Sequence, residues 1–152
     1  MNSKQQIDPV HTSALLRGLF QAPRLEAFLE SEAGSLNMPP LHEYISALCE
    51  QKGVPRIEVI RRSGLERSYG FQIFQGTKNP SRDKLLQLAI GFDMGYDQTQ
   101  ALLKIARSSA LYPRFKRDAA IIFCLNKHLG FTETQELLAR IGMPILGKEL
   151  GA

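Results

Sequence analysis

Residues 58–76 read EVIRRSGLERSYGFQIFQG, and this stretch decides which fold we expect. Apolar residues three and four positions apart predict one short helix at 55–63 and another at 66–75. Between them, Gly64 lets the chain reverse, and Leu65 supplies an apolar side chain that fills the space between the two helices. The stretch therefore predicts a helix, a tight turn and a second helix.

The second of these helices carries a polar outer surface that packing alone does not require. Its apolar stripe is thin, whereas its other positions hold long hydrogen-bonding side chains. These polar residues are Glu66, Arg67, Ser68, Tyr69, Gln72 and Gln75. Gly76 predicts a left-handed cap that ends the helix, and the loop that follows carries Lys78. We infer that this helix presents a surface for recognition.

Positive charge is concentrated around the same stretch. The chain has a formal net charge of +4, but residues 52–84 contain eight basic and three acidic residues, so this segment carries +5 and the remainder −1. Polyanions such as nucleic acids bind to patches of this kind. A solvated basic face without a partner is the alternative, and charge alone does not separate the two.

Helical periodicity extends along the whole chain, and strand patterns are nearly absent. Asp8 and Pro9 are typical of a helix start, and apolar stripes follow at 15–20 and 25–29, on either side of Pro23. The expected fold class is therefore all-α.

Turn-like residues at 34–40 indicate a boundary after the N-terminal stripes. Beyond it, an amphipathic helix ends at Gly53, and Ser81 is expected to cap a helix that carries leucines into the core. The expected divisions are an N-terminal helical arm at 1–38, a helix-turn-helix domain at 39–106 and a C-terminal helical extension at 107–152.

The C-terminal extension repeats part of the domain before it. A shift of 35 residues places RDKLLQLAIGFDMGYDQTQALL on RDAAIIFCLNKHLGFTETQELL. Seven pairs are identical: Arg82 and Arg117, Asp83 and Asp118, Gly95 and Gly130, Thr99 and Thr134, Gln100 and Gln135, Leu102 and Leu137, and Leu103 and Leu138. Each copy predicts a helix, a glycine–aromatic turn, a cap at Asp97 or Thr132 and a second helix. Repeated helical hairpins usually build packing surface, so we expect an interaction or dimerisation module here.

Composition argues against several classes of protein. With 43% hydrophobic and 22% charged residues, the chain has the balance of an ordinary folded protein. No apolar run approaches the roughly 20 residues that span a bilayer, and residues 1–10 lack the apolar core of a signal peptide. Cys49 and Cys124 lie in apolar helical patterns and are expected to be buried free thiols in a reducing cytoplasm, with a disulfide as the alternative.

Catalytic patterns are also missing from the sequence. It contains no nucleophile–base set, no glycine-rich phosphate loop and no paired carboxylates of a cleft. The histidines His11, His42 and His128 are too scattered to indicate a metal site. We therefore expect no enzyme activity, no metal, no cofactor and no membrane partner.

Residues 41–104 resemble the Cro/CI-type helix-turn-helix domain, the lambda-repressor-like group that is also called the XRE family. The resemblance covers under half of the 152 residues and rests on EVIRRSGL (58–65), IFQG (73–76), NPS (79–81) and LLQLA (85–89). Two residues depart from the family pattern. Gly70 stands where Ile or Val is usual, and we expect Tyr69 or Phe71 to fill the gap; Glu66 replaces the more common small N-cap residue.

The resemblance implies which residues touch DNA. Those that open the recognition helix and form its next exposed turn would contact base edges in the major groove, and these are Glu66, Arg67, Ser68, Tyr69 and Gln72. Residues before, at the end of and after this helix would contact phosphates, and these are Arg56, Gln75, Thr77, Lys78 and Asn79. Whether the Tyr69 ring faces DNA or is buried beside Gly70 stays open.

Other basic residues have different expectations. For Arg61 and Arg62 we favour a solvated face or pairs within the chain over contacts with DNA. Arg114, Lys116 and Arg117 form a second basic cluster, either solvated or in contact with phosphates.

The family resemblance implies a sequence-specific DNA-binding transcriptional regulator in a bacterial or phage cytoplasm. We expect a homodimer on double-stranded DNA at a pseudo-palindromic site, with residues 9–32 and 113–141 supplying either dimer contacts or a docking surface. The alternative is a protein-interaction adaptor or antitoxin-like subunit, which binds a protein partner through the N- and C-terminal helices.

Overall fold

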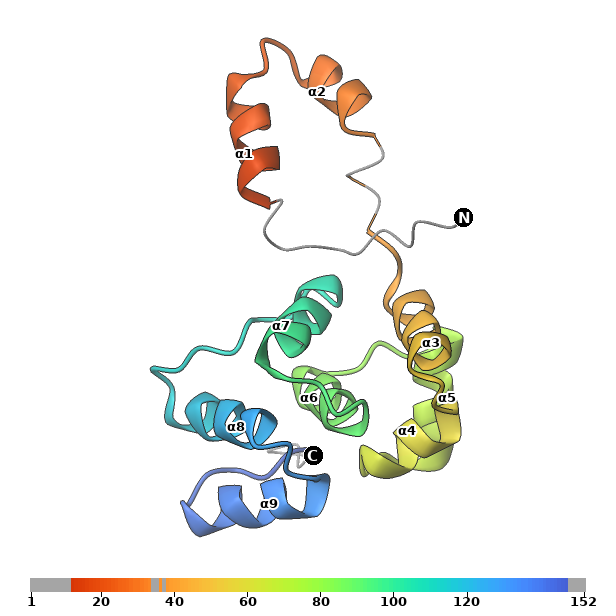
Figure 1. The fold of residues 1–152 in the computed structure, drawn as a ribbon, viewed down its shortest axis with the longest axis vertical. Coiled ribbons are helices and arrows are strands. Elements are labelled where there is room, and N and C mark those ends of the chain that lie inside the picture. Colours follow the sequence, from red (N-terminus) through yellow and green to blue (C-terminus); the bar gives the residue numbers. More distant parts are fainter. Residues whose placement is uncertain (1–11, 34–35, 37, 148–152) are drawn as a thin grey trace. The chain divides into compact units, whose positions relative to one another are not determined.

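The computed structural model describes residues 12–33, 36 and 38–147 of the chain. Within these residues it contains nine α-helices and no strand, so the expected all-α class is confirmed (Figure 1). The chain divides into two compact units, residues 1–39 and residues 40–152.

The first unit contains a pair of short helices. α1 (Thr12–Gln21) and α2 (Leu25–Ser31) pack against each other, and the predicted break at Pro23 lies between them. Among the described residues of this unit only Phe28 is buried. Its exposed large apolar residues are Leu16, Leu19, Phe20, Leu25, Leu29, Leu36 and Met38. The helix start expected at Asp8 and Pro9 lies outside the described residues.

Seven helices form the described part of the second unit. They are α3 (Leu41–Lys52), α4 (Arg56–Arg62), α5 (Arg67–Gln75), α6 (Arg82–Gly91), α7 (Tyr96–Ile105), α8 (Lys116–Asn126) and α9 (Phe131–Arg140). Gly53 and Gly76 end α3 and α5, as predicted. Both have the left-handed conformation that was predicted for Gly76, with φ of 64° and 81°. Ser81 caps α6, because its hydroxyl accepts a hydrogen bond from the Lys84 amide.

Helix α6 lies at the centre of this unit. Every residue from Leu85 to Gly91 is buried, and α6 packs against α4, α7 and α9 (Figure 1). A helix that is buried on all sides is typical of the middle of a helical core. The same apolar cluster continues through Leu111, Ile121, Leu125, Leu138 and Leu146. The C-terminal hairpin therefore shares one core with the helices before it.

The 35-residue repeat is also present in the structure. α6 with α7 and α8 with α9 form two helical hairpins, and a left-handed residue follows the first helix of each, Asp93 and His128, both with φ of 55°. A second left-handed pair, Arg107 and Gly142, follows the second helix of each hairpin. The backbone thus turns at equivalent positions in the two copies.

The second helix of each hairpin begins two residues earlier than expected. Its N-cap is Gly95 in one copy and Gly130 in the other, so the caps predicted at Asp97 and Thr132 are wrong. In both copies the buried threonine four residues after the glycine donates a hydrogen bond of 2.8 Å to the glycine carbonyl. Because a buried hydroxyl needs a partner, the earlier start satisfies these threonines within their own helices.

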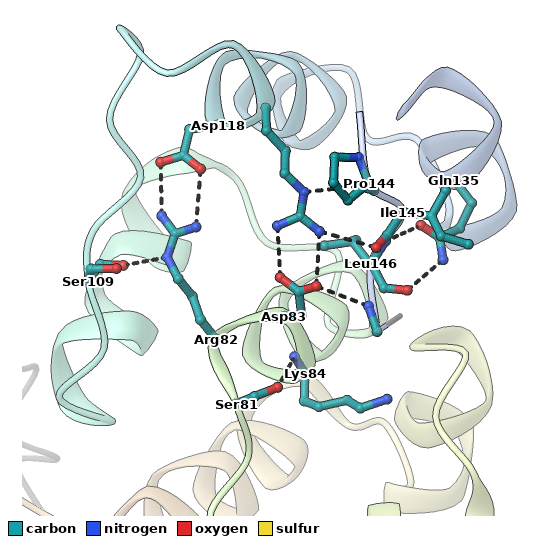
Figure 2. Close-up of polar contacts among 12 residues, drawn as sticks. Ser81, Arg82, Asp83, Lys84, Ser109, Asp118, Gln135, Pro144, Ile145 and Leu146 are labelled. Carbon is teal, nitrogen blue, oxygen red and sulfur yellow. Dashed lines mark hydrogen bonds and ion pairs between the residues drawn. The ribbon is translucent and has the colours of Figure 1, made fainter. Parts of the chain in front are cut away.

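Two arginine–aspartate pairs join the hairpins crosswise. Arg82 on α6 donates to both oxygens of Asp118 on α8 at 3.1 and 2.9 Å, and Figure 2 shows this pair in full. Arg117 on α8 donates to both oxygens of Asp83 on α6 at 2.9 Å each. The arginine of each copy therefore pairs with the aspartate of the other copy, and the two ion pairs occupy equivalent positions in the repeat.

Candidate functional site

Helix α4, which precedes the turn, packs through its apolar face and carries arginine–glutamate ion pairs on its surface. Val59 and Ile60 are buried, whereas Arg61 and Arg62 are exposed and both donate to the Glu58 carboxylate. The hydrogen bond from Arg61 is the largest influence that lowers the pKa of Glu58. The expectation of intramolecular pairs is therefore confirmed for both arginines.

The turn between α4 and α5 is fixed by three contacts. The buried Ser63 hydroxyl donates to the Val59 carbonyl at 2.6 Å, and the Ser63 carbonyl accepts from the buried Gln87 amide at 3.1 Å. Gly64 has φ of 69°, and a Cβ atom added there would lie 2.3 Å from the Phe131 ring of α9. Only glycine fits this position, because both the backbone conformation and the nearby ring exclude a side chain.

Glu66 caps the second helix. Its two carboxylate oxygens accept hydrogen bonds from the backbone amides of Tyr69 at 2.8 Å and Ser68 at 2.9 Å. These bonds lower the pKa of Glu66, the one from Tyr69 more strongly. Glu66 thus fixes the direction of α5 at the end where the predicted base-contacting residues lie.

Helix α5 lies unusually close to α4 at Gly70. A Cβ atom at this glycine would be 2.5 Å from Cγ2 of Ile60, so the glycine permits the two helices to touch. The expectation that Tyr69 or Phe71 fills a gap at Gly70 is wrong, because Ile60 already occupies that space. A side chain as large as that of Ile or Val would not fit here unless Ile60 moved.

Most of the predicted contact residues are exposed. Two of the ten, Tyr69 and Gln72, are partly buried. The exposed ones are Arg56, Glu66, Arg67, Ser68, Gln75, Thr77, Lys78 and Asn79. None of the ten is in the core, so this surface is accessible within the second unit. Within the described part of the chain, Arg56, Arg67 and Lys78 form no ion pair with an acidic residue.

Two of these residues are tied to neighbouring elements. The Arg56 guanidinium, at the start of α4, lies 5.6 Å from the centre of the Phe74 ring near the end of α5. The Tyr69 ring packs partly against the core, and the Lys84 ammonium group of α6 lies 5.8 Å from its centre. Tyr69 is therefore neither fully buried nor fully exposed, and Lys84 joins the basic residues around α5.

The second basic cluster behaves differently. Arg114 and Lys116 are exposed, but Arg117 is held by Asp83 and by the carbonyls of Pro144 and Ile145. Sequence reasoning missed the role of Arg117, although the identical Arg-Asp dipeptide in both copies of the repeat was a signal for it.

Both cysteines, Cys49 and Cys124, are free and buried, as expected, and burial raises the pKa of each thiol. In the described residues no three His, Cys, Asp or Glu side chains are grouped in a way that would hold a metal ion. The same part of the chain has no helix with the length and apolar character needed to cross a membrane.

Comparisons with protein-family models, with curated proteins and with solved structures found no match for this chain.

Proposed function

We propose that this protein is a sequence-specific DNA-binding transcriptional regulator with a lambda-repressor-like helix-turn-helix domain. In this proposal α4 and α5 are the two helices of the motif, and α5 enters the major groove of double-stranded DNA. The observation that carries the proposal is the combination of a rigid turn at Gly64 with an exposed polar face on α5.

The proposed base contacts lie at the start of α5. Arg67 and Ser68 are exposed there, and a guanidinium can donate two hydrogen bonds to a guanine edge. Gln72, one turn further, can pair with adenine in the same way. Glu66 is the least favoured of the proposed base contacts, because its oxygens already accept two amide hydrogen bonds.

The proposed phosphate contacts surround the far end of α5. Arg56, Gln75, Thr77, Lys78 and Asn79 are all exposed in that region. Of the eight basic residues between positions 52 and 84, Arg61, Arg62 and Arg82 have acidic partners within the chain. The remaining positive charge is the part available for a polyanion.

We further propose that the protein acts as a homodimer on a pseudo-palindromic site. Dimers of this motif place two recognition helices in successive major grooves, about 34 Å apart. The exposed apolar residues of α1 and α2 supply a surface that a second copy can cover.

The experiment that tests this function begins with selection of bound duplexes from random DNA by the full chain. Fluorescence anisotropy then measures the affinity for the selected duplex over a salt series. We expect one enriched sequence and a steep loss of affinity with salt, because binding to phosphates releases counterions. Absence of enrichment together with an affinity that salt does not change would contradict the proposal.

A protein-interaction adaptor is the second candidate. It is favoured by the exposed aromatic residues Tyr112 and Phe115, just before α8, and Phe123 within α8. This candidate predicts that Phe123→Glu abolishes assembly with a protein partner, whereas Arg67→Ala does not. If the protein is a regulator, Arg67→Ala should weaken binding to DNA, whereas Phe123→Glu should not.

A further inference from the structure

A hollow of about 270 Å³ lies behind the end of α5. Four parts of the second unit line it: the start of α3, the end of α5, the loop that follows Gly76, and the end of α7. Leu41, Ile73 and Ile105 are apolar residues of its lining, and Ile73 and Ile105 are largely buried beneath it. A volume of this size accommodates a small molecule of roughly ten non-hydrogen atoms.

The charged groups that line the hollow are all basic. Lys78 comes from the loop and Arg107 from the end of α7, and both side chains are exposed. Within the described residues neither forms an ion pair, and no acidic residue lines the hollow. An anion placed between them would therefore meet two cations and no carboxylate.

Further polar groups complete the lining. Asn79 contributes an amide and His42 a ring nitrogen. The His42 ring lies directly over Gly76, because a Cβ atom at that glycine would be 2.7 Å from Nδ1 of His42. The missing side chain at Gly76 thus lets His42 lie at the edge of the hollow.

We propose that this hollow is a binding site for a small organic anion with a phosphate or carboxylate group and a compact apolar body. Lys78, Arg107 and Asn79 donate to the anionic group, since charge-assisted hydrogen bonds are the stronger kind. Leu41, Ile73 and Ile105 contact the apolar body. This combination of an apolar wall and a few polar groups is typical of ligand sites.

The site also implies a regulatory effect, and this step rests on the proposed function. Lys78 and Asn79 are proposed phosphate contacts for DNA, so an anion bound to them competes with the DNA backbone. The ligand would therefore bind more tightly to the DNA-free protein than to the DNA complex. Because coupling between two binding sites is reciprocal, the ligand would weaken DNA binding by the same factor.

The first test measures binding of phenyl phosphate, inorganic phosphate and phenol to the full chain without DNA, by isothermal titration calorimetry at constant ionic strength. We expect saturable binding of phenyl phosphate that is about tenfold tighter than that of either inorganic phosphate or phenol, because only phenyl phosphate uses both the cations and the apolar wall. Equal weak binding of all three probes would overturn the proposal.

Two matched variants locate the site. Arg107→Gln removes a charge from the hollow, whereas Arg114→Gln removes the same charge from an exposed residue outside it. We expect the first variant to weaken binding of phenyl phosphate by about tenfold, a typical loss for one charge-assisted hydrogen bond, and the second to leave it unchanged. An equal effect of both would overturn the location.

The last test adds a duplex selected by the wild-type protein. We expect phenyl phosphate to lower the affinity of the wild-type chain for this duplex and to have a smaller effect on Arg107→Gln. Unchanged DNA affinity at saturating phenyl phosphate would overturn the competition. If the chain binds no duplex, the proposed function fails, whereas the calorimetric result still decides whether the hollow binds anions.

Discussion

Arg117 holds Asp83, which lies 34 residues earlier in the chain, through two hydrogen bonds of 2.9 Å each. The same aspartate also accepts from the Gly147 amide at 3.1 Å. In the other copy of the repeat, Asp118 accepts from Arg82 and from the Tyr112 amide. Each hairpin therefore supplies the counter-charge of the other, and we expect the two to unfold together.

Replacing Arg117 tests this exchange. Arg117→Ala leaves Asp83, whose side chain is only 25% exposed, without its cation. We expect a loss of about 1–3 kcal/mol in the free energy of unfolding, measured by urea denaturation. Arg114→Ala is the control on an exposed arginine and should change stability by less than about 0.5 kcal/mol. Similar small effects of both substitutions would contradict the assigned role.

Acid should weaken the same connection. Burial acts to raise the pKa of Asp83 and of Asp118. The arginine hydrogen bond, a backbone amide hydrogen bond and the charges of Arg82 and Arg117 together outweigh it, so each pKa is below its usual value. A depressed pKa in the folded state contributes stability that is present above the unfolded-state value of about 3.9 and is lost as the pH falls through the folded-state value.

We therefore expect the free energy of unfolding to fall as the pH is lowered from about 5 toward 2. The double variant Asp83→Asn and Asp118→Asn should show a shallower decline, because it lacks these two titrating groups. Urea denaturation at a series of pH values measures both slopes. Identical slopes for the two proteins would show that other carboxylates control the acid response.

The contact at Gly70 gives a prediction whose sign distinguishes two effects. Helix propensity alone predicts that Gly70→Ala stabilises the protein by about 1 kcal/mol. The 2.5 Å approach of the added Cβ to Ile60 predicts instead a net loss of about 1–3 kcal/mol from overpacking. Thermal and urea unfolding measure the change, and a gain in stability would show that α4 and α5 can separate without cost.

Much of the helical structure was predictable because it follows local rules. The apolar spacing of α3 to α6 and the glycines at positions 53 and 76 define helix bodies and ends without knowledge of the rest of the chain. Pro23 and Ser81 likewise mark a break and a cap through their own chemistry.

The errors come from contacts between distant parts of the chain. The fit at Gly70 depends on how closely Ile60 approaches from another helix, which periodicity does not encode. The repeat was visible as an identity of residues, but the crosswise pairing of Arg117 with Asp83 depends on the relative orientation of the hairpins. The helix starts at Gly95 and Gly130 were missed because Asp97 and Thr132 are equally good caps when judged locally.

Arg67 offers the most direct test of the account. The measurement compares the affinities of wild type, Arg67→Ala and Lys78→Ala for the selected duplex and for each of its single-base-pair variants. We predict that Arg67→Ala costs about 1–3 kcal/mol on the selected duplex and removes the preference at one base pair. Lys78→Ala should weaken binding to every duplex alike and reduce the salt dependence. If both variants bind all duplexes as the wild type does, the exposed face of α5 does not read DNA.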